Sequence, residues 1–289
     1  MVVIIGAGIV GCTTAYYLTK MGWHNIVVID QGPLFETGGS TSHAPGLVFQ
    51  VNASKILTEF AKDSVDLYSS LDLDGDPCWY PVGGIEVAWT QDRLEDLKRK
   101  VGLAKSWGVE AHLISPKAAQ EQIPLLSGKI LGAMYVASDG VAKAIKISEA
   151  LARKCEAHGV KFYGHTEVTG IEARSGHVRA VQTTRGRIET DTVVAAAGIW
   201  GPRVGHMVNI PIPLSPMQHL LAVTTPLPEL KGTTVEISQP MLRHQDKSMY
   251  FRQFGESYII GAYNHEPIPS GVDDILPHDT APIMPSIMP

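Results

Sequence analysis

The sequence lacks long apolar runs and an excess of positive charge. No apolar run approaches the roughly 18 residues that a bilayer-spanning helix needs. Its 24 Lys and Arg residues against 29 Asp and Glu residues give a net charge of -5. A chain with this balance offers no basic surface for a nucleic acid. We therefore expect neither a membrane nor a nucleic acid as a partner.

Cysteine is also scarce. The 289 residues include only 3 cysteines, Cys12, Cys78 and Cys155, with no metal-ligand spacing between them. This usage indicates reduced thiols and no metal site. No signal or transit segment precedes the first predicted strand, which starts at Met1, so we expect a cytoplasmic bacterial enzyme, or a mitochondrial matrix location in a eukaryote.

The first thirty residues have the pattern of a dinucleotide-binding unit. Two short apolar runs, 1–5 and 26–29, flank the glycine motif 6–11, and Asp30 follows the second run. The order predicts strand, helix and strand. We expect Val10, Thr14, Tyr17, Leu18 and Met21 to form the buried face of the helix, which Gly22 ends.

Each part of this motif has a physical task. Gly6 permits the tight turn, Gly8 lets the backbone approach a pyrophosphate, and Gly11 lets the helix pack closely on the strand. The helix N-terminus offers free N–H groups to the anion. Asp30 is placed to accept hydrogen bonds from ribose hydroxyls.

The later sequence favours FAD over NAD. After Asp30 the chain enters a long loop, whereas a nicotinamide domain would continue to alternate strands and helices. Strands are expected at 160–163 and 167–172, followed by a hairpin at 185–186. A buried strand then runs into a glycine turn over 192–201. An NAD-dependent dehydrogenase is the less favoured alternative.

Helices and a second sheet account for most of the remaining chain. Helical periodicity covers 54–71, 93–107 and 142–158, and the first of these should bury Ile56, Leu57, Phe60, Ser64, Leu67 and Leu71. Strands at 79–81 and 85–88, with a later set in 217–263, should form a substrate-facing sheet. Residues 264–289 are rich in proline and should carry no regular element.

At this point the sequence resembles a known family. The motif at 6–11, the run 30–34, the loop 38–50 and the segment 242–246 are similar to those of FAD-dependent amine oxidoreductases of the D-amino-acid oxidase superfamily. Within that superfamily the resemblance is greatest to dimethylglycine oxidase and to dimethylglycine and sarcosine dehydrogenases, and it extends to about residue 269.

The resemblance implies an α/β (α+β) fold with a Rossmann-like FAD-binding domain interleaved with a β-rich substrate domain. Its parts would be 1–78 and 142–210 for FAD, 79–141 and 211–263 for substrate, and an irregular tail at 264–289. Family members continue with a segment that returns to the FAD domain, and the oxidase also carries a folate-binding module. We expect both to be missing here, which makes an inactive fragment one possible reading.

The resemblance also assigns the cofactor site. His43 would be joined covalently to the flavin 8α-methyl carbon, and Val168 would meet the adenine through its backbone. The residues expected to contact the cofactor are Gly6, Gly8, Ile9, Val10, Gly11, Asp30, Gln31, Ser40, Thr41, Ser42, His43, Leu47, Val168, Gly198 and Tyr250.

Three residues of the second sheet are the catalytic candidates. Oxidation of a dimethylglycine or sarcosine amine by hydride transfer to flavin N5 requires the neutral amine, which His219 would stabilise. Tyr250 would orient the substrate, and Arg252 would bind its carboxylate. Without the resemblance, each of these strand residues reads as packing or as solvated. A catalytically silent protein, similar to the regulatory subunit of pyruvate dehydrogenase phosphatase, is the alternative from another class.

Overall fold

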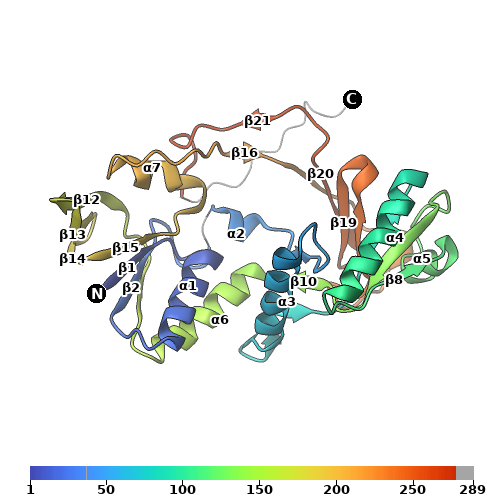
Figure 1. Cartoon of the computed structure of the whole chain (residues 1–289), viewed down its shortest axis with the longest axis horizontal. Coiled ribbons are helices and arrows are strands. Elements are labelled where there is room, and N and C mark those ends of the chain that lie inside the picture. Colours follow the sequence, from blue (N-terminus) through green and yellow to red (C-terminus); the bar gives the residue numbers. More distant parts are fainter. Residues whose placement is uncertain (37, 278–289) are drawn as a thin grey trace.

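The computed structural model describes residues 1–36 and 38–277. Two sheets dominate the chain, and the helices α1, α3 and α6 lie between and beside them (Figure 1). The helices are α1 Ile9–Lys20, α2 Ser40–His43, α3 Lys55–Ser69, α4 Gln91–Ser106, α5 Pro116–Gln122, α6 Ala144–Glu156 and α7 Gly201–His206. Short 3-10 turns are η1 Gly198–Trp200, η2 Pro228–Leu230 and η3 Gln245–Lys247.

The first sheet is parallel and begins at the first residues. Its order is β11–β2–β1–β15, from Lys161–Tyr163, Ile26–Ile29, Val2–Ile5 and Thr192–Ala195. Val2 and Ile4 point to one face, where α1 and α6 pack, whereas Val3 and Ile5 point to the other. Because both faces are covered, β1 and β2 are apolar at every position rather than alternating.

A small antiparallel sheet covers the second face of the parallel sheet. It consists of β12 Val168–Arg174, β13 His177–Thr183 and β14 Gly186–Glu189, in that order. Its residues Val168 and Val181 join Val204 of α7 in a cluster with Val3 and Ile5. The strand, helix and strand unit, the later strands and the hairpin turn that the sequence predicts are therefore all present.

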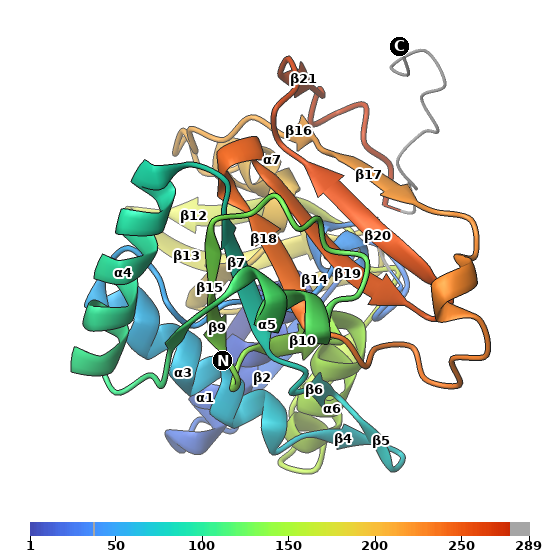
Figure 2. The same cartoon turned by 90° about the vertical axis from the view of Figure 1, so that its right-hand side faces the viewer.

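The second large sheet has seven strands in the order β17–β20–β19–β18–β7–β9–β8. The strands span Leu220–Val223, Ser257–Ala262, Met249–Phe254, Met241–His244, Gly84–Ala88, Gly132–Val136 and His112–Ile114. The helix α4 packs beside Ala88 and Met134, and α5 packs on the opposite face beside Ile85 (Figure 2). Segments 84–136 and 220–262 thus build one sheet although helices and parallel strands separate them in sequence.

Short strands connect the two large sheets. β10 (Gly140–Ala142) pairs with β3 (Leu47–Val48) and with β6 (Trp79–Tyr80), and β4 (Asp72–Leu73) pairs with β5 (Asp76–Pro77). The expectation that residues 79–81 join the substrate-facing sheet is wrong, because β6 pairs with β10 instead. This small sheet packs against Met241 at the start of β18, so it anchors the loop that precedes it to the second sheet.

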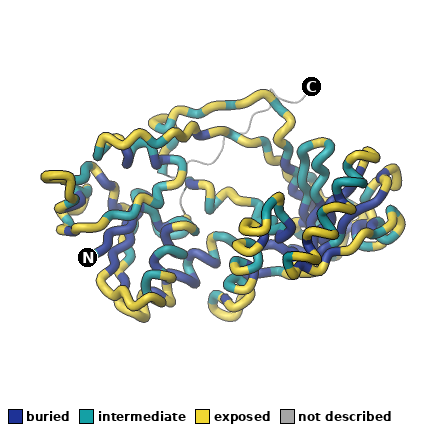
Figure 3. The backbone as a smooth tube through the Cα atoms, viewed as in Figure 1, coloured by how far each residue is buried: buried dark blue, intermediate teal, exposed yellow. Residues whose placement is uncertain are grey.

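The expectation of no regular element after residue 263 is also wrong for part of that segment. β21 (Ile268–Pro269) pairs with β16 (Met217–Gln218), as an edge strand in which the missing N–H of proline costs nothing. Beyond it the chain crosses to the parallel sheet, where Trp200 Nε1 donates to the Ile275 carbonyl over 3.1 Å. The crossing is largely exposed (Figure 3). Residues 278–289, which share the same expectation, lie outside the described residues.

The predicted buried faces of two helices are not the faces that pack. In α1, Val10 and Met21 are 62% and 73% exposed, and the buried residues are Gly11, Cys12 and Ala15. A side-chain carbon on Gly11 would lie 1.9 Å from the Gly6 carbonyl oxygen, so the helix approaches its strand too closely for large residues.

In α3 the bounds are as expected, but the buried residues differ. Ile56, Leu57 and Phe60 are each at least half exposed, and Thr58 and Val65 are buried. Ser54 caps the helix by accepting a hydrogen bond from the Leu57 N–H. Apolar periodicity therefore located both helices correctly and oriented them incorrectly.

Across the described ranges, no helix is both long and apolar enough to cross a bilayer. The three cysteines are free and buried. Within those same ranges, no group of histidine, cysteine and carboxylate side chains has the arrangement of a metal site.

Candidate functional site

The glycine turn lies where the strands of the parallel sheet end. Gly6 has a φ of +108°, and a side-chain carbon there would lie 2.4 Å from the Ala196 carbonyl oxygen of the neighbouring strand end. Gly8 caps α1 in an extended conformation without a side-chain hydrogen bond. Ligands of open α/β sheets bind at the carboxyl ends of the strands, so this edge fits a pyrophosphate group.

Asp30 holds this turn together. Its Oδ2 accepts a hydrogen bond from the Ala7 N–H over 2.8 Å, and its Oδ1 accepts one from the Gly32 N–H over 2.9 Å. Burial raises the pKa of Asp30, and these two hydrogen bonds oppose that rise. Each carboxylate oxygen keeps a second lone pair, so a ribose hydroxyl still has an acceptor here.

Replacing Asp30 with alanine is expected to weaken FAD binding by roughly 10-fold or more, the usual scale for a hydrogen bond to a charged group. Flavin fluorescence titration measures this. Asp191, an exposed acid just before β15 at the other end of the same sheet, provides the matched control Asp191→Ala. Because Asp30 also ties the turn, urea unfolding of the apoprotein should accompany the titration. Unchanged flavin affinity would contradict the ribose assignment.

The loop with the candidate flavin-linking histidine docks on the start of α1. Thr41 Oγ1 accepts a hydrogen bond from the Ile9 N–H over 3.1 Å, and it is the group that a side chain on Gly8 would meet first. His43 ends α2 and is exposed. Its Nδ1 lies 3.0 Å from the Gly39 carbonyl oxygen. A carbonyl only accepts, so Nδ1 carries the proton and Nε2 keeps the lone pair.

The other cofactor candidates surround the same edge. Val168 is buried at the start of β12, and the Thr166 N–H just before it donates to the Asp30 carbonyl over 2.7 Å. Gly198 is exposed with a φ of +51° where β15 leads into η1. The remaining candidates lie in the first turn of α1, just after β2, in α2 or in β3: Ile9, Val10, Gly11, Gln31, Ser40, Ser42 and Leu47. The residues present therefore fit a dinucleotide such as FAD.

Two of the three catalytic candidates meet on the seven-stranded sheet. His219, just before β17, lies edge-on to Tyr263 with ring centroids 4.9 Å apart, and Tyr263 lies 5.6 Å from Tyr250. His265 is 6.1 Å from His219. Tyr263 and His265 were not singled out in the sequence. The antiparallel register that brings them to His219, with Leu220 opposite Ala262, is visible only once the strands are paired.

Tyr250 is held in a fixed position by a glycine. Gly261 lies opposite it on β20, and a side-chain carbon there would lie 1.9 Å from the Tyr250 ring. The ring therefore lies flat over the neighbouring strand. Burial, with the neighbouring Tyr263 as a smaller cause, raises the pKa of Tyr250 to about 12. Its hydroxyl is thus protonated at neutral pH and can donate a hydrogen bond to a ligand.

The third catalytic candidate is already engaged. Arg252 is 7% exposed, and its Nη1 lies 3.2 Å from both the Glu236 carboxylate and the Gln253 carbonyl oxygen. Lys143 also pairs with Glu236. The strand register places Arg252 beside Met241 rather than beside Tyr263. The geometry is that of an internal ion pair, so it does not support the expected role in binding a substrate carboxylate.

A buried acidic residue lies between the two sheets. Asp139 is 1% exposed, and its Oδ1 accepts hydrogen bonds from the Gln50 backbone N–H over 2.9 Å and from Gln50 Nε2 over 3.2 Å. Burial raises the pKa of Asp139 to about 7, with the Gln50 hydrogen bonds and the charge of Arg243 opposing that rise and Glu86 adding to it.

This pKa predicts a pH dependence of stability. Because the folded-state pKa lies above the ordinary value, the stabilisation is complete below about pH 4 and is lost as the pH rises through 7. Asp139→Asn is expected to flatten this decline and to gain on the order of 2 kcal/mol relative to the parent protein between pH 5 and 8. Urea unfolding at several pH values measures it, with exposed Asp74→Asn as the control. Parallel curves for Asp139→Asn and the parent would refute the assignment.

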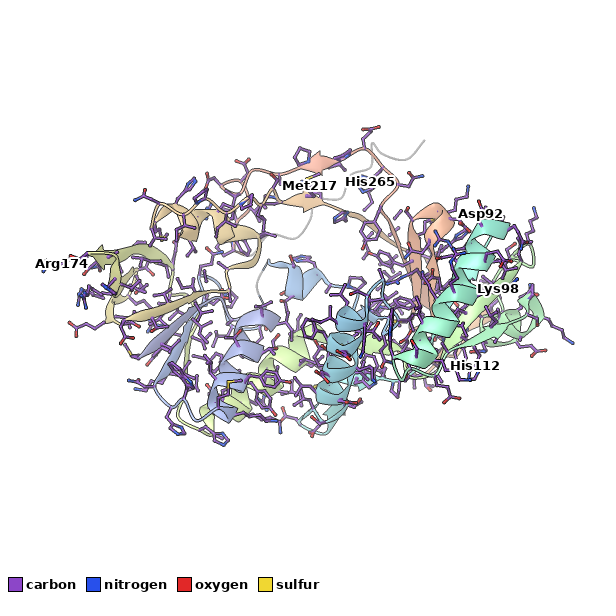
Figure 4. The ribbon with its side chains drawn as sticks, in the orientation of Figure 1. Asp92, Lys98, His112, Arg174, Met217 and His265 are labelled. Carbon is purple, nitrogen blue, oxygen red and sulfur yellow. The ribbon has the colours of Figure 1, made fainter. Side chains whose placement is uncertain are left out.

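The two groups of candidates face a common space. α2, with His43, lies between the parallel sheet and the strands β19 and β20 (Figure 1). Met217 and His265 lie on the crossing formed by β16, β21 and their connections (Figure 4). A cofactor extending from the glycine turn past His43 would therefore point its far end toward the sheet that carries Tyr250.

Comparisons with known proteins agree with this arrangement. A family model described as FAD dependent oxidoreductase matches residues 1–288. Mitochondrial sarcosine dehydrogenase of Mus musculus is 32% identical over 277 residues, covering 92% of this chain and 29% of the relative. Mitochondrial dimethylglycine dehydrogenase of Homo sapiens is 33% identical over 267 residues, covering 91% and 30%.

A relative with a different kind of name is equally similar. The mitochondrial pyruvate dehydrogenase phosphatase regulatory subunit of Mus musculus is 34% identical over 273 residues, covering 93% of this chain and 30% of the relative. The chain thus spans less than a third of the length of these three curated relatives.

Solved structures show the same fold. L-proline dehydrogenase from P. horikoshii superposes with a TM-score of 0.80 at 27% identity, over 92% of this chain and 70% of that one. Glycine oxidase from Geobacillus kaustophilus gives 0.74 at 24% identity, over 93% and 72%. The mixed α/β fold expected from the resemblance is confirmed. The chain belongs to the FAD dependent oxidoreductase family.

Proposed function

We propose that this chain is the FAD-binding and substrate-binding part of an oxidoreductase that acts on N-methylated glycines, dimethylglycine first and sarcosine second. The observation that carries the proposal is the contact series from His219 through Tyr263 to Tyr250 on a sheet that faces α2. The names of the dehydrogenase relatives support the choice of substrate class. FAD, when bound, supplies the two-electron acceptor for the carbon–hydrogen bond beside the amine nitrogen.

The protein's own groups would prepare the amine. An N-methylated glycine is an ammonium ion at neutral pH, and its nitrogen lone pair is needed before the adjacent carbon can be oxidised. We assign to His219 the acceptance of that proton, because it is an exposed imidazole at the edge of the aromatic cluster. Tyr250, protonated and fixed over Gly261, donates a hydrogen bond that orients the substrate.

We also propose that FAD is attached covalently through His43. The contact between its Nδ1 and the Gly39 carbonyl oxygen fixes the tautomer with a free lone pair on Nε2, which is the state needed to form a bond to carbon. The position of α2 between the glycine turn and the second sheet suits a residue that holds the flavin ring.

The absorption spectrum and its response to substrate test the function. Bands near about 370 and 450 nm indicate bound flavin, and anaerobic dimethylglycine should bleach the 450 nm band. Trimethylglycine is the matched control, because its quaternary nitrogen has no lone pair and it should cause no bleaching. Bound flavin that no N-methylated glycine reduces would favour the second candidate, a catalytically silent regulatory protein, which the likeness to the phosphatase regulatory subunit suggests.

The location and the partners are proposals of the same kind. We infer a small N-methyl amine as the substrate, and folate as a second partner only through a further module. The location would be the cytoplasm of a bacterium, or the mitochondrial matrix of a eukaryote as the relatives' names indicate for those proteins.

A further inference from the structure

Arg243 is a cation on the substrate-facing side of the seven-stranded sheet. It lies directly opposite Tyr250 on β19 and opposite Glu86 on β7. Side chains that face each other across antiparallel strands have Cβ atoms roughly 5 Å apart and share one face. Arg243 and Tyr250 are therefore close enough to contact the same small molecule.

The guanidinium group is held in place by stacking rather than by an ion pair. Its Cζ lies 4.0 Å from the centre of the Phe49 ring, two residues after Leu47 in the loop that follows His43. Among residues 1–36 and 38–277, Arg243 makes no side-chain hydrogen bond and no ion pair within 4 Å. Stacking on a ring occupies the face of the guanidinium and leaves the N–H groups at its edge available.

The nearby acids do not use these donors. Glu86, at 2% exposure, pairs with Lys100 over 2.7 Å. Asp139 accepts its hydrogen bonds from Gln50. Burial lowers the pKa of Arg243, and the charges of Glu86, Asp139 and Tyr263 act against that decrease. The half-buried cation is thus stabilised at a distance, while its hydrogen-bonding edge lacks a partner in the part of the chain that is described.

We propose that Arg243 binds the carboxylate of the amino-acid substrate, with the amine nitrogen placed at Tyr250 and His219. The proposal deepens the proposed function and rests on it. In a glycine derivative one carbon separates the carboxylate from the nitrogen, so a ligand that spans neighbouring side chains of one sheet face matches this size. A guanidinium edge binds a carboxylate through two parallel hydrogen bonds. The expected role thus moves from Arg252, which is bound to Glu236, to Arg243.

Substrate pairs that differ only in the carboxylate test this assignment. Arg243→Met is expected to lower kcat/KM for dimethylglycine by roughly 10²-fold, mainly through KM, the scale for two charge-assisted hydrogen bonds. The same variant should change kcat/KM for dimethylglycinamide by less than about 3-fold. Arg243→Lys keeps the charge without the two-pronged geometry and should lie between the two. The ratio of the two substrates is measured within each folded variant, so a general loss of stability does not imitate the effect.

Binding without turnover gives a second measurement. By calorimetry, the parent protein should bind trimethylglycine more tightly than tetramethylammonium, and Arg243→Met should abolish that preference. Arg252→Met is the matched control, and it should retain the preference while lowering stability, since it leaves Glu236 with fewer partners.

The outcomes separate the two proposals. Equal losses for dimethylglycine and its amide in Arg243→Met, with an active parent protein, would overturn the role of Arg243 and leave the proposed function standing. A parent protein that oxidises no N-methylated glycine would overturn the proposed function. In that case, loss of the trimethylglycine preference in Arg243→Met would still support carboxylate binding, and its persistence would overturn it.

Discussion

Replacement of His219 by alanine is expected to slow reduction of bound flavin by dimethylglycine by roughly 10²-fold or more, the usual scale for a positioned acid–base group. The physical reason is that the substrate nitrogen must give up a proton before its neighbouring carbon is oxidised, and His219 is the imidazole beside Tyr263 and Tyr250. Anaerobic stopped-flow spectroscopy at 450 nm measures the reduction rate directly. The deficit should shrink as the pH rises, because the free amine then becomes more abundant in solution.

Two further variants give this experiment its controls. His112 is exposed on β8, far from the candidate site (Figure 4), so His112→Ala should reduce at the parental rate. Tyr250→Phe removes the hydroxyl that orients the substrate, and it should also slow reduction. It should lower flavin content more than His219→Ala does, because the resemblance assigns Tyr250 a cofactor contact as well. Parental reduction rates for His219→Ala at every pH would show that this histidine is structural.

The fold was predictable wherever local sequence determines structure. The glycine motif, the apolar strands and the capped helices identified β1, α1, β2 and α3 to within a few residues. The orientation of the helices was not predictable in the same way. α1 buries Gly11, Cys12 and Ala15 because it packs closely against β1 and α6, and the larger side chains of its apolar stripe lie outside that contact. Periodicity records which residues are apolar, whereas packing distance decides which of them fit.

The candidate site divides along the same line. The nucleotide-binding residues follow one another in sequence, so a motif was sufficient to find the turn that Asp30 holds. The substrate residues come from strands that are distant in the chain, and their neighbours depend on register. Arg243 and Arg252 are equally cationic in sequence, and only the pairing of β18 with β19 shows that Arg243 is opposite Tyr250. The engagement of Arg252 by Glu236 depends on a loop contact that no local pattern encodes.

Replacement of His43 by alanine is expected to convert tightly retained flavin into releasable flavin. In the parent protein, acid precipitation should leave the yellow colour in the pellet, because a covalent bond survives unfolding. In His43→Ala the colour should move to the supernatant, because the glycine turn and Asp30 hold FAD only while the protein is folded. Mass spectrometry of a proteolytic digest should place the added mass on the peptide that contains His43.

A second histidine with the same local geometry is the control for this prediction. His158 follows α6, and its Nδ1 lies 2.9 Å from the Lys154 carbonyl oxygen, four residues earlier, just as His43 contacts Gly39 over 3.0 Å. Both imidazoles therefore keep a free lone pair on Nε2. Only His43 lies beside the glycine turn, through the contact of Thr41 with Ile9. His158→Ala should leave the colour in the pellet, so tautomer alone does not select the linkage and position near the cofactor does. Flavin released by acid from the unmodified protein would refute the covalent assignment.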